Sequence, residues 1–348
     1  MSLSVRNLEV SFRTYGGSVS AVRGVNIDVG EGECLAVVGE SGCGKSVTAQ
    51  TIMRLIPSPP AEIRGSVTMD GTELLTLPEK RMKEIRGAKI GMIFQDPMTS
   101  LDPTMQIGKQ ITEALTAHDR GMRRGDAADR AIEVLGMAGI PNPEKQFRRY
   151  AYEFSGGMRQ RVVIAMAIIC RPRLLIADEP TTALDVTTQA QILDLIRDLK
   201  TKLGTSVVII THDMGVVANM ADRIAVFYAG QVVEEGRAED VFQNPSHPYT
   251  AALLLSRPSL DWDRGQKLAS VPGTPPDLFA PPAGCGFFDR CPAAMEVCRE
   301  SLPEFFEAEN RGGVSHRSLC WLHHQFGKAE LARWISGGRG LEGPGRLR

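Results

Sequence analysis

The sequence predicts an α/β fold built on a parallel sheet, followed by a small C-terminal appendage. Short apolar runs alternate with stretches of helical periodicity up to about residue 255, which is typical of a parallel sheet. These runs end in polar residues, at the sheet edge where such folds bind ligands. Beyond Leu255, prolines and cysteines replace the helical pattern, which predicts a domain boundary.

Length and composition agree with a large domain plus a smaller one. The chain has 348 residues, of which 43% are hydrophobic and 23% charged, so collagen-like, disordered and membrane-spanning classes are excluded. We divide it into residues 1–257, residues 258–325 and a flexible tail, residues 326–348, with the boundary near 256–270. The net charge is -1, so no global positive field would hold nucleic acid. No secretory signal is visible, and a cytosolic setting favours thiols or metal ligands over disulfides for the cysteines.

Each predicted strand leads into a candidate functional residue. The apolar runs predicted to be strands are residues 34–38, 90–94, 174–177 and 207–210. The first run stops at Gly39, and the polar residues that follow the others include Gln95, Asp178, Glu179 and His212. Helices are predicted at about 46–55, within 106–139, at 156–170 and at 187–203, from their apolar periodicity.

The segment 39–46, Gly-Glu-Ser-Gly-Cys-Gly-Lys-Ser, matches the phosphate-binding pattern G-x-x-x-x-G-K-[ST] between a strand and a helix. Its glycines let backbone N–H groups surround phosphates at a helix N-terminus. Lys45 is expected to contact the β- and γ-phosphates, and Ser46 to bind Mg²⁺. The predicted nucleotide contacts here are Gly39, Glu40, Ser41, Gly42, Cys43, Gly44, Lys45, Ser46 and Val47.

Two acidic residues complete the predicted site. Asp178 ends an apolar strand and supplies a carboxylate for Mg²⁺, while Glu179 can polarise the attacking water. Their alternatives are a helix cap for Asp178 and a solvated charge for Glu179.

A second glycine pair begins the helix after Phe154. In Phe-Ser-Gly-Gly-Met-Arg-Gln-Arg, residues 154–161, the contacts Ser155, Gly156 and Gly157 would present N–H groups to a phosphate. The alternative is an ordinary N-cap by Ser155. A second phosphate-binding helix start makes sense if it completes the site of a partner chain, which predicts a dimer with ATP at the interface.

Together these motifs resemble those of the ABC ATPases over residues 1 to about 255. The resemblance implies a RecA-like P-loop core with an antiparallel β subdomain and a helical subdomain at about 97–165. It also implies that Gln95 contacts Mg²⁺ and the attacking water, that His212 contacts the γ-phosphate, and that Asp185, in the D-loop at residues 183–185, acts across the dimer. Tyr15 would stack on adenine, the alternative being a packed tyrosine.

The residues required for hydrolysis are all present. Those expected to take part are Lys45, Gln95, Glu179 and His212, with Ser46, Gln95 and Asp178 at Mg²⁺. ATP hydrolysis is therefore expected. Phe154 and Met158 depart from the commonest Leu-Ser-Gly-Gly-Gln signature, and Met158 puts a glutamine-mediated polar contact in doubt.

A narrower resemblance, to the oligopeptide and dipeptide importer ATPases, rests on residues 94–103, residues 244–250 and the cysteine segment. It implies a second ATPase subunit, with a heterodimer favoured, two membrane permeases and an extracytoplasmic solute-binding protein, at the cytoplasmic face of the inner membrane. Related systems import nickel, opines or sugar conjugates. The alternatives are an ABC ATPase acting on DNA or ribosomes and a P-loop small-molecule kinase.

The cysteines of the appendage have the spacing C-x5-C-x6-C-x21-C. They are Cys285, Cys291, Cys298 and Cys320. The spacing lacks the paired C-x2-C of structural zinc and is compatible with an iron–sulfur cluster. Zinc, held by the thiolates alone or with His316 or His323 in place of one of them, and unliganded thiols stay open. The family resemblance implies a [4Fe–4S] cluster, with a structural role preferred over redox gating.

Overall fold

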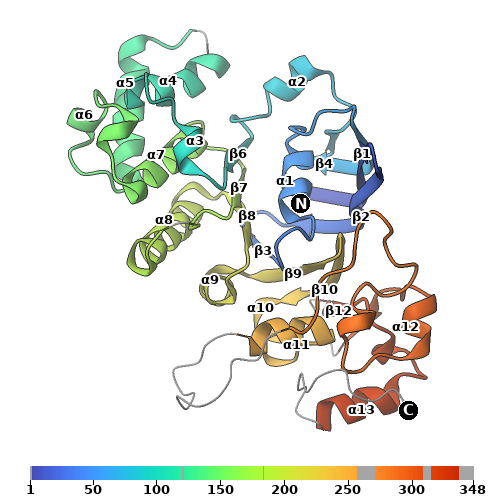
Figure 1. Cartoon of the computed structure of the whole chain (residues 1–348). Coiled ribbons are helices and arrows are strands. Elements are labelled where there is room, and N and C mark those ends of the chain that lie inside the picture. Colours follow the sequence, from blue (N-terminus) through green and yellow to red (C-terminus); the bar gives the residue numbers. More distant parts are fainter. Residues whose placement is uncertain (1, 120, 183, 257–270, 309–314, 337–348) are drawn as a thin grey trace.

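The computed structural model describes residues 2–119, 121–182, 184–256, 271–308 and 315–336 (Figure 1). In this part of the chain the larger sheet has eight strands in the order β11-β12-β10-β9-β3-β8-β7-β6. Its parallel strands are β3 (Cys34–Val38), β6 (Ile90–Ile93), β7 (Leu174–Asp178), β8 (Ser206–Thr211) and β9 (Arg223–Tyr228). The predicted α/β fold and its predicted strands are confirmed.

Strands β3, β7 and β8 are buried along their whole length, as expected when both faces of a parallel sheet are covered. Alternate side chains enter different cores. Leu35 and Val37 of β3 belong to a cluster with Ala49 of helix α1 (Lys45–Ile52). Ala36 and Val38 belong to a second cluster with helices α7 (Gly156–Ile168), α8 (Val186–Leu203) and α9 (Met214–Met220).

A four-stranded sheet covers the α1 side of the larger sheet (Figure 1). It has the order β2-β1-β4-β5 and pairs antiparallel. Its strands are β1 (Leu3–Thr14), β2 (Gly17–Val29), β4 (Ala61–Met69) and β5 (Thr72–Glu73), with the short helix α2 (Glu79–Lys83) following. Buried Leu8 and Val10 on β1 join the α1 core.

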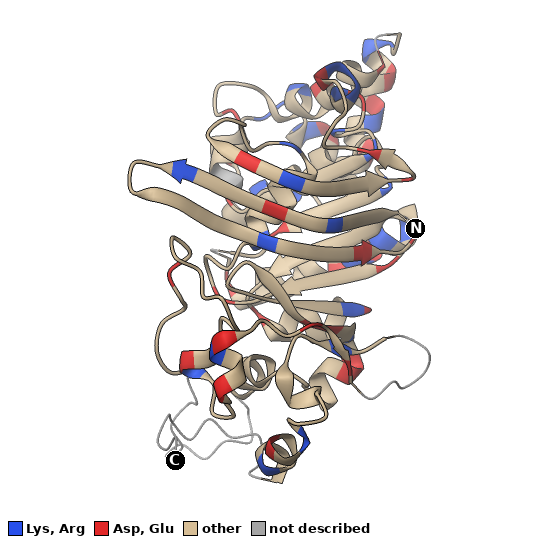
Figure 2. Cartoon of the chain, turned by 90° about the vertical axis from the view of Figure 1, so that its right-hand side faces the viewer, with Lys and Arg blue, Asp and Glu red and all other residues tan. Residues whose placement is uncertain are grey.

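On the face in Figure 2, basic and acidic residues are interspersed among the described residues, without one sign dominating.

A group of helices between β6 and β7 stands apart from the antiparallel sheet (Figure 1). Its members are α3 (Pro97–Ser100), α4 (Ile107–His118), α5 (Arg124–Met137), α6 (Pro143–Gln146) and α7. The periodicity over 106–139 therefore corresponds to two helices. They are separated by a turn in which the Asp119 carboxylate accepts the N–H of Gly121.

The chain then returns to the larger sheet and passes into the C-terminal part. The antiparallel strand β10 (Gln231–Arg237) pairs with β9 and is followed by helices α10 (Ala238–Gln243) and α11 (Pro248–Leu255). The boundary predicted near 256–270 falls largely outside the described residues. We call residues 271–308 and 315–336 the cysteine lobe.

The cysteine lobe adds strands to the larger sheet. Strand β12 (Arg317–Ser318) pairs antiparallel with β10, and β11 (Phe306–Glu307) pairs with β12. The rest consists of η2 (Phe288–Arg290), α12 (Glu296–Glu300), η3 (Trp321–His323) and α13 (Lys328–Ser336). The flexible tail predicted from residue 326 is wrong for Lys328–Ser336, because Trp334 is buried and anchors this helix. No helix in the described ranges is long and apolar enough to span a membrane.

Candidate functional site

The phosphate loop connects β3 to α1 and requires glycine at two close approaches. Gly39 has φ 151°, and a Cβ there would lie 2.2 Å from the carbonyl oxygen of Phe227. Gly44 has φ 102°, and a Cβ there would lie 2.4 Å from the carbonyl oxygen of Ala21. The buried Lys45 donates from Nζ to the carbonyls of Gly39 and Glu40, at 2.8 Å each. The loop thus has the compact backbone that phosphate binding requires.

Ser46 and Asp178 meet at the start of α1. The Ser46 hydroxyl donates to Oδ1 of Asp178 at 2.9 Å. Burial of Asp178 raises the pKa of its carboxyl; the charge of Glu179 adds to this effect, while the Ser46 hydrogen bond and the Lys45 charge oppose it. A cation bound between these oxygens would restore the ionised form. The helix-cap alternative for Asp178 is wrong, because the next helix is capped by Asp185.

Glu179 is the centre of a hydrogen-bonded cluster. Its Oε2 accepts from Nε2 of Gln95 and from Oγ1 of Thr182, both at 2.9 Å. Oε1 lies 3.4 Å from Nδ1 of His212. The Glu179 side chain is 14% exposed, so the solvated-charge alternative is wrong. Residues from two other strand ends and from its own turn therefore converge on this carboxylate.

The backbone of Glu179 is also constrained. Its φ is 46°, in the left-handed region that non-glycine residues rarely adopt, and its N–H donates to the carbonyl of Ile210. Sequence reasoning missed Thr182. The signal available for it was its position three residues after Glu179, within reach of the same turn.

Tyr15 lies at the hairpin between β1 and β2, at the edge of the antiparallel sheet. Its side chain is fully exposed, so the packed-tyrosine alternative is wrong. An exposed ring at a hairpin tip is free to stack on a planar ligand.

The segment 154–158 begins helix α7 in the helical group, away from α1 (Figure 1). Ser155 caps this helix and accepts from the N–H of Met158 at 3.4 Å, as the N-cap alternative predicted. The two departures from the common signature are packing residues, because Phe154 is buried and Met158 packs against the core. Gly157 approaches Thr188 of α8 so closely that a Cβ would lie 2.6 Å from its methyl carbon.

Asp185 caps helix α8 at the exposed edge beside the signature. It accepts from the backbone N–H and the hydroxyl of Thr188, at 2.9 and 2.7 Å, and these bonds lower the pKa of its carboxyl. Val186, which follows, is 82% exposed. Ala183, which precedes this segment, lies outside the described residues.

The four cysteines of the lobe border one small cavity, together with His247. None of the four forms a disulfide. Burial raises their pKa values, to about 11 for Cys285. The backbone N–H groups of Phe287, Ala293 and Leu322 hydrogen-bond to the sulfurs of Cys285, Cys291 and Cys320, respectively, which is an arrangement that favours thiolate ligands.

His247 provides a further observation at this cavity. Its Nδ1 accepts from the N–H of Tyr249 at 3.1 Å, and burial lowers the pKa of its imidazole to about 3, so the ring is neutral with its hydrogen on Nε2. That buried nitrogen has no hydrogen-bond partner among the described residues. A group bearing acceptor atoms in the cavity would satisfy it.

The structure tests the predicted metal ligands of the lobe only in part. No three His, Cys, Asp or Glu side chains in the described ranges form a site for a single metal ion. The two histidines considered as zinc ligands are engaged elsewhere, since His316 bonds to Glu234 at 2.8 Å and His323 to the carbonyl of Ser246 at 2.7 Å. Zinc ligation by these histidines is therefore not supported.

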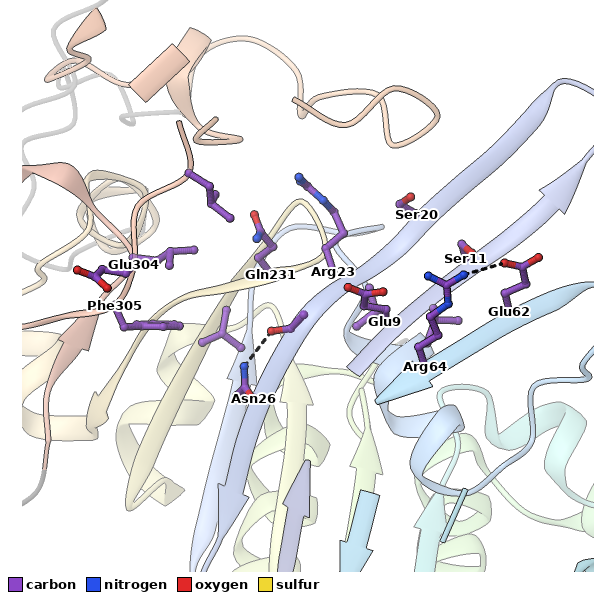
Figure 3. A pocket seen from close by; sticks show the side chains of 16 residues that line it. Glu9, Ser11, Ser20, Arg23, Asn26, Glu62, Arg64, Gln231, Glu304 and Phe305 are labelled. Atoms are coloured by element: carbon purple, nitrogen blue, oxygen red, sulfur yellow. Dashed lines mark hydrogen bonds and ion pairs between the residues drawn. The ribbon is translucent and has the colours of Figure 1, made fainter. Parts of the chain in front are cut away.

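A larger groove, of about 730 Å³, lies between the antiparallel sheet and the cysteine lobe (Figure 3). Its polar lining mixes both signs of charge, including Glu9, Arg23, Arg64 and Glu304. It contains none of the predicted nucleotide contacts. The candidate site is therefore the phosphate loop with its neighbouring strand ends, and the groove is separate from it.

Comparison with known proteins agrees with this geometry. The family described as "ABC transporter" matches residues 22–182, and "Oligopeptide/dipeptide transporter, C-terminal region" matches residues 233–298. The chain is 54% identical to the oligopeptide transport ATP-binding protein OppD of Bacillus subtilis, covering 92% of this chain and 89% of that protein. It is 52% identical to the dipeptide transport ATP-binding protein DppD of the same organism, covering 93% and 95%.

Comparison with solved structures also identifies the fold as that of an ATP-binding cassette. A dimeric ATP-binding cassette in a post-hydrolysis state with ADP and phosphate matches with a TM-score of 0.61 and 30% identity, covering 68% of this chain and 98% of that one. The curated relative OppD covers 92% of this chain, against 68% for this cassette, and the family match to the C-terminal region lies at residues 233–298. The chain belongs to the family of oligopeptide and dipeptide transport ATP-binding proteins, within the ABC transporter ATPases.

Proposed function

We propose that this chain is the ATP-hydrolysing subunit of an importer for dipeptides or oligopeptides. One observation carries the ATPase assignment: Ser46 meets Asp178 beside a Glu179 that is held by Gln95, Thr182 and His212. The substrate class rests on the names of the relatives, which are oligopeptide and dipeptide transport ATP-binding proteins.

Each residue of the site would have a separate role in the transfer of the γ-phosphoryl group to water. The loop N–H groups and Lys45 would hold the phosphates, and Ser46 and Asp178 would hold Mg²⁺, which neutralises phosphate charge when it is bound. Glu179 would orient a water molecule and accept its proton. Gln95 and His212 contact Glu179 and would fix its carboxylate toward that water, with His212 also reaching the γ-phosphate. Tyr15 would stack on the adenine.

The signature would act on a second nucleotide. Ser155 and Gly156 are exposed at the start of α7, and Asp185 and Val186 are exposed beside them. An exposed anion-binding helix start next to an exposed apolar residue suits a subunit interface. We therefore propose a second ATPase subunit, a heterodimer by the family resemblance, whose nucleotide is closed by residues 155–157 of this chain.

The membrane partners follow from the family. We propose two permease subunits and an extracytoplasmic solute-binding protein, with this chain bound at the cytoplasmic face of the inner membrane. The segment 95–110 would face the permeases. A movement of this segment on permease contact would shift Gln95 and, through their hydrogen bond, the carboxylate of Glu179. We also propose residues 1–257 as the ATPase domain, containing a helical subdomain at about 97–165, and 258–325 as a distinct C-terminal domain.

We further propose that the four lobe cysteines hold a [4Fe–4S] cluster. Their shared cavity, the N–H groups directed at the sulfurs and the unsatisfied Nε2 of His247 support a group with sulfur acceptors. Such a cluster would cross-link the lobe and could exchange one electron. We assign it the structural role, because the lobe has short elements and a small core.

Metal analysis tests the cluster. Iron and acid-labile sulfide are measured in anaerobically purified protein, with Cys298→Ser as the variant and Cys170→Ser as the control. We expect about four of each atom per chain, lost in Cys298→Ser and kept in Cys170→Ser. Stoichiometric zinc without sulfide, or neither metal nor sulfide, would contradict the proposal.

Reconstitution tests the proposed function. The chain, its partner ATPase and the permeases are placed in proteoliposomes, and phosphate release is measured with the binding protein either empty or loaded. Stimulation by peptide-loaded binding protein, absent in Lys45→Ala, is the expected result. If binding protein loaded with nickel or a sugar conjugate stimulates phosphate release and peptide-loaded binding protein does not, the proposed substrate class is wrong.

A further inference from the structure

Glu40, the second residue of the phosphate loop, is held from the C-terminal side of the chain by its backbone and its side chain. Its N–H donates to the hydroxyl of Tyr249 at 2.9 Å. Its carboxylate accepts two bonds from Arg290, from Nη1 at 2.8 Å and from Nη2 at 2.9 Å. Its carbonyl accepts from Nζ of Lys45. A shift of Glu40 would therefore move the lysine expected at the phosphates.

Arg290 is itself fixed by the cysteine lobe and by Tyr228 of β9. Its side chain is 4% exposed, and it donates to the carbonyl of Pro272 at 2.7 Å and to the hydroxyl of Tyr228 at 3.1 Å. A bidentate arginine–carboxylate pair in this setting defines both distance and orientation. Removing one partner of a buried pair costs more than removing an exposed one.

The position of Arg290 links the loop to the cysteine cavity. It ends the short helix η2, between Cys285 and Cys291, and its N–H donates to the carbonyl of Phe287. Tyr249 makes a parallel connection, because its N–H bonds to His247, which borders the same cavity. Both contacts on Glu40 thus begin within two residues of the cavity lining.

A second surface of the lobe also reaches the loop. Pro275, Pro276 and Leu278 border a small cavity together with loop residues 40–43. The carbonyl of Leu278 accepts the N–H of Ser20 on β2, and Phe279 lies against the hairpin glycines that follow Tyr15. The lobe therefore contacts both ends of the proposed nucleotide site.

We propose that Arg290 is a positioning residue that ties the phosphate loop to the cysteine lobe, so that the affinity for MgATP depends on this lobe. The proposal rests on the proposed function, since it assigns the nucleotide to the loop at residues 39–46. Because coupling is reciprocal, MgATP binding also stabilises the lobe. Arg290 itself contacts no reacting atom.

Equilibrium binding of a fluorescent ATP analogue with Mg²⁺ to the purified full chain tests this. Arg290→Met is compared with Arg317→Met, which removes a different arginine–glutamate contact between lobe and sheet, Arg317 to Glu235 at 2.7 Å. We expect Kd to rise on the order of tenfold in Arg290→Met, to recover partly in Arg290→Lys, and to change less than about twofold in Arg317→Met. The effects of Glu40→Gln and Arg290→Met should not add, because they break one pair.

The possible results separate this inference from the proposed function. Unchanged affinity in Arg290→Met, or an equal loss in Arg317→Met, would overturn it. Full binding by Lys45→Ala would instead contradict the nucleotide site itself. If Arg290→Met does not fold, Tyr249→Phe removes the other contact on Glu40 and keeps the ring; a Kd equal to that of the wild type would then overturn the proposal.

Discussion

The nucleotide site and the cysteine lobe hold their functional groups by different means. In the nucleotide site, residues distant in sequence meet because parallel strands end at one edge; Asp178 pairs in register with Ile210 and Val38 with Thr211. The lobe has only two-residue strands and short helices, and it is held by buried contacts with the larger sheet and the phosphate loop. The backbone of the larger sheet therefore keeps the nucleotide-site residues in place, whereas the cysteine lobe depends on its contacts with that sheet and with the phosphate loop.

The largest expected effect is on the rate of ATP hydrolysis, with nucleotide binding unchanged. Glu179→Gln should lower the kcat for ATP hydrolysis by at least about 100-fold, because it removes the base that would activate water, and should leave MgATP binding intact. Phosphate release at saturating MgATP measures this, with Glu300→Gln, an exposed glutamate of the lobe, as the control. A decrease of only a few-fold would contradict the role of Glu179.

The next effect concerns the attachment of the lobe. Phe287 is buried among Tyr228, Tyr249 and His247, so Phe287→Ala should lower the free energy of unfolding by about 3–5 kcal/mol. Urea unfolding measures this loss. The control Phe279→Ala, at a half-exposed ring that packs on the hairpin glycines, should cost clearly less, about 1 kcal/mol. Equal costs for the two variants would show that the lobe is not held by this aromatic cluster.

A smaller effect should follow from the hydrogen bond that sequence reasoning missed. Thr182→Val removes the hydroxyl that donates to Glu179 and should reduce kcat roughly fivefold, as expected for one hydrogen bond of about 1 kcal/mol. Thr182→Ser keeps the hydroxyl and should restore most of the rate. If the serine variant is as slow as the valine variant, the methyl group and not the hydrogen bond is responsible.

The smallest effect concerns the thiol of the phosphate loop. Cys43 is buried, and this burial raises the pKa of its thiol, so little reactive thiolate is present at pH 7. Inactivation by a neutral thiol reagent should be slow at pH 7 and faster as the pH rises. Rapid inactivation at pH 7 that Cys43→Ala abolishes would show that the loop opens.

The nucleotide site could be predicted from sequence because its residues follow apolar runs that form neighbouring strands. Gln95, Glu179 and His212 each stand at such a position, and the sheet order brings them together. The turn that carries Thr182 has no such pattern. The N-cap by Ser155 was predicted as an alternative, whereas the helix cap by Asp185 was not predicted, because the family resemblance implied only a role across the dimer. A partner chain would complete the proposed role of both residues.

The lobe was harder to predict because its structure depends on contacts distant in sequence. The spacing of the cysteines indicated a shared site, but nothing local indicated that β12 would extend the larger sheet. The pairing of Arg290 with Glu40 spans 250 residues, and no periodicity predicts it. The helix Lys328–Ser336 was missed because it buries only a short apolar face, with Trp334 buried and Leu331 partly buried.

The proposed role in peptide import is tested by uptake of labelled dipeptides and pentapeptides in cells whose own copy is replaced by either the native chain or Glu179→Gln. We expect the native chain to support uptake of at least one peptide class and the variant, expressed at the same level, to support none. Equal peptide uptake with both chains, in cells without a second ATPase able to substitute, would contradict it.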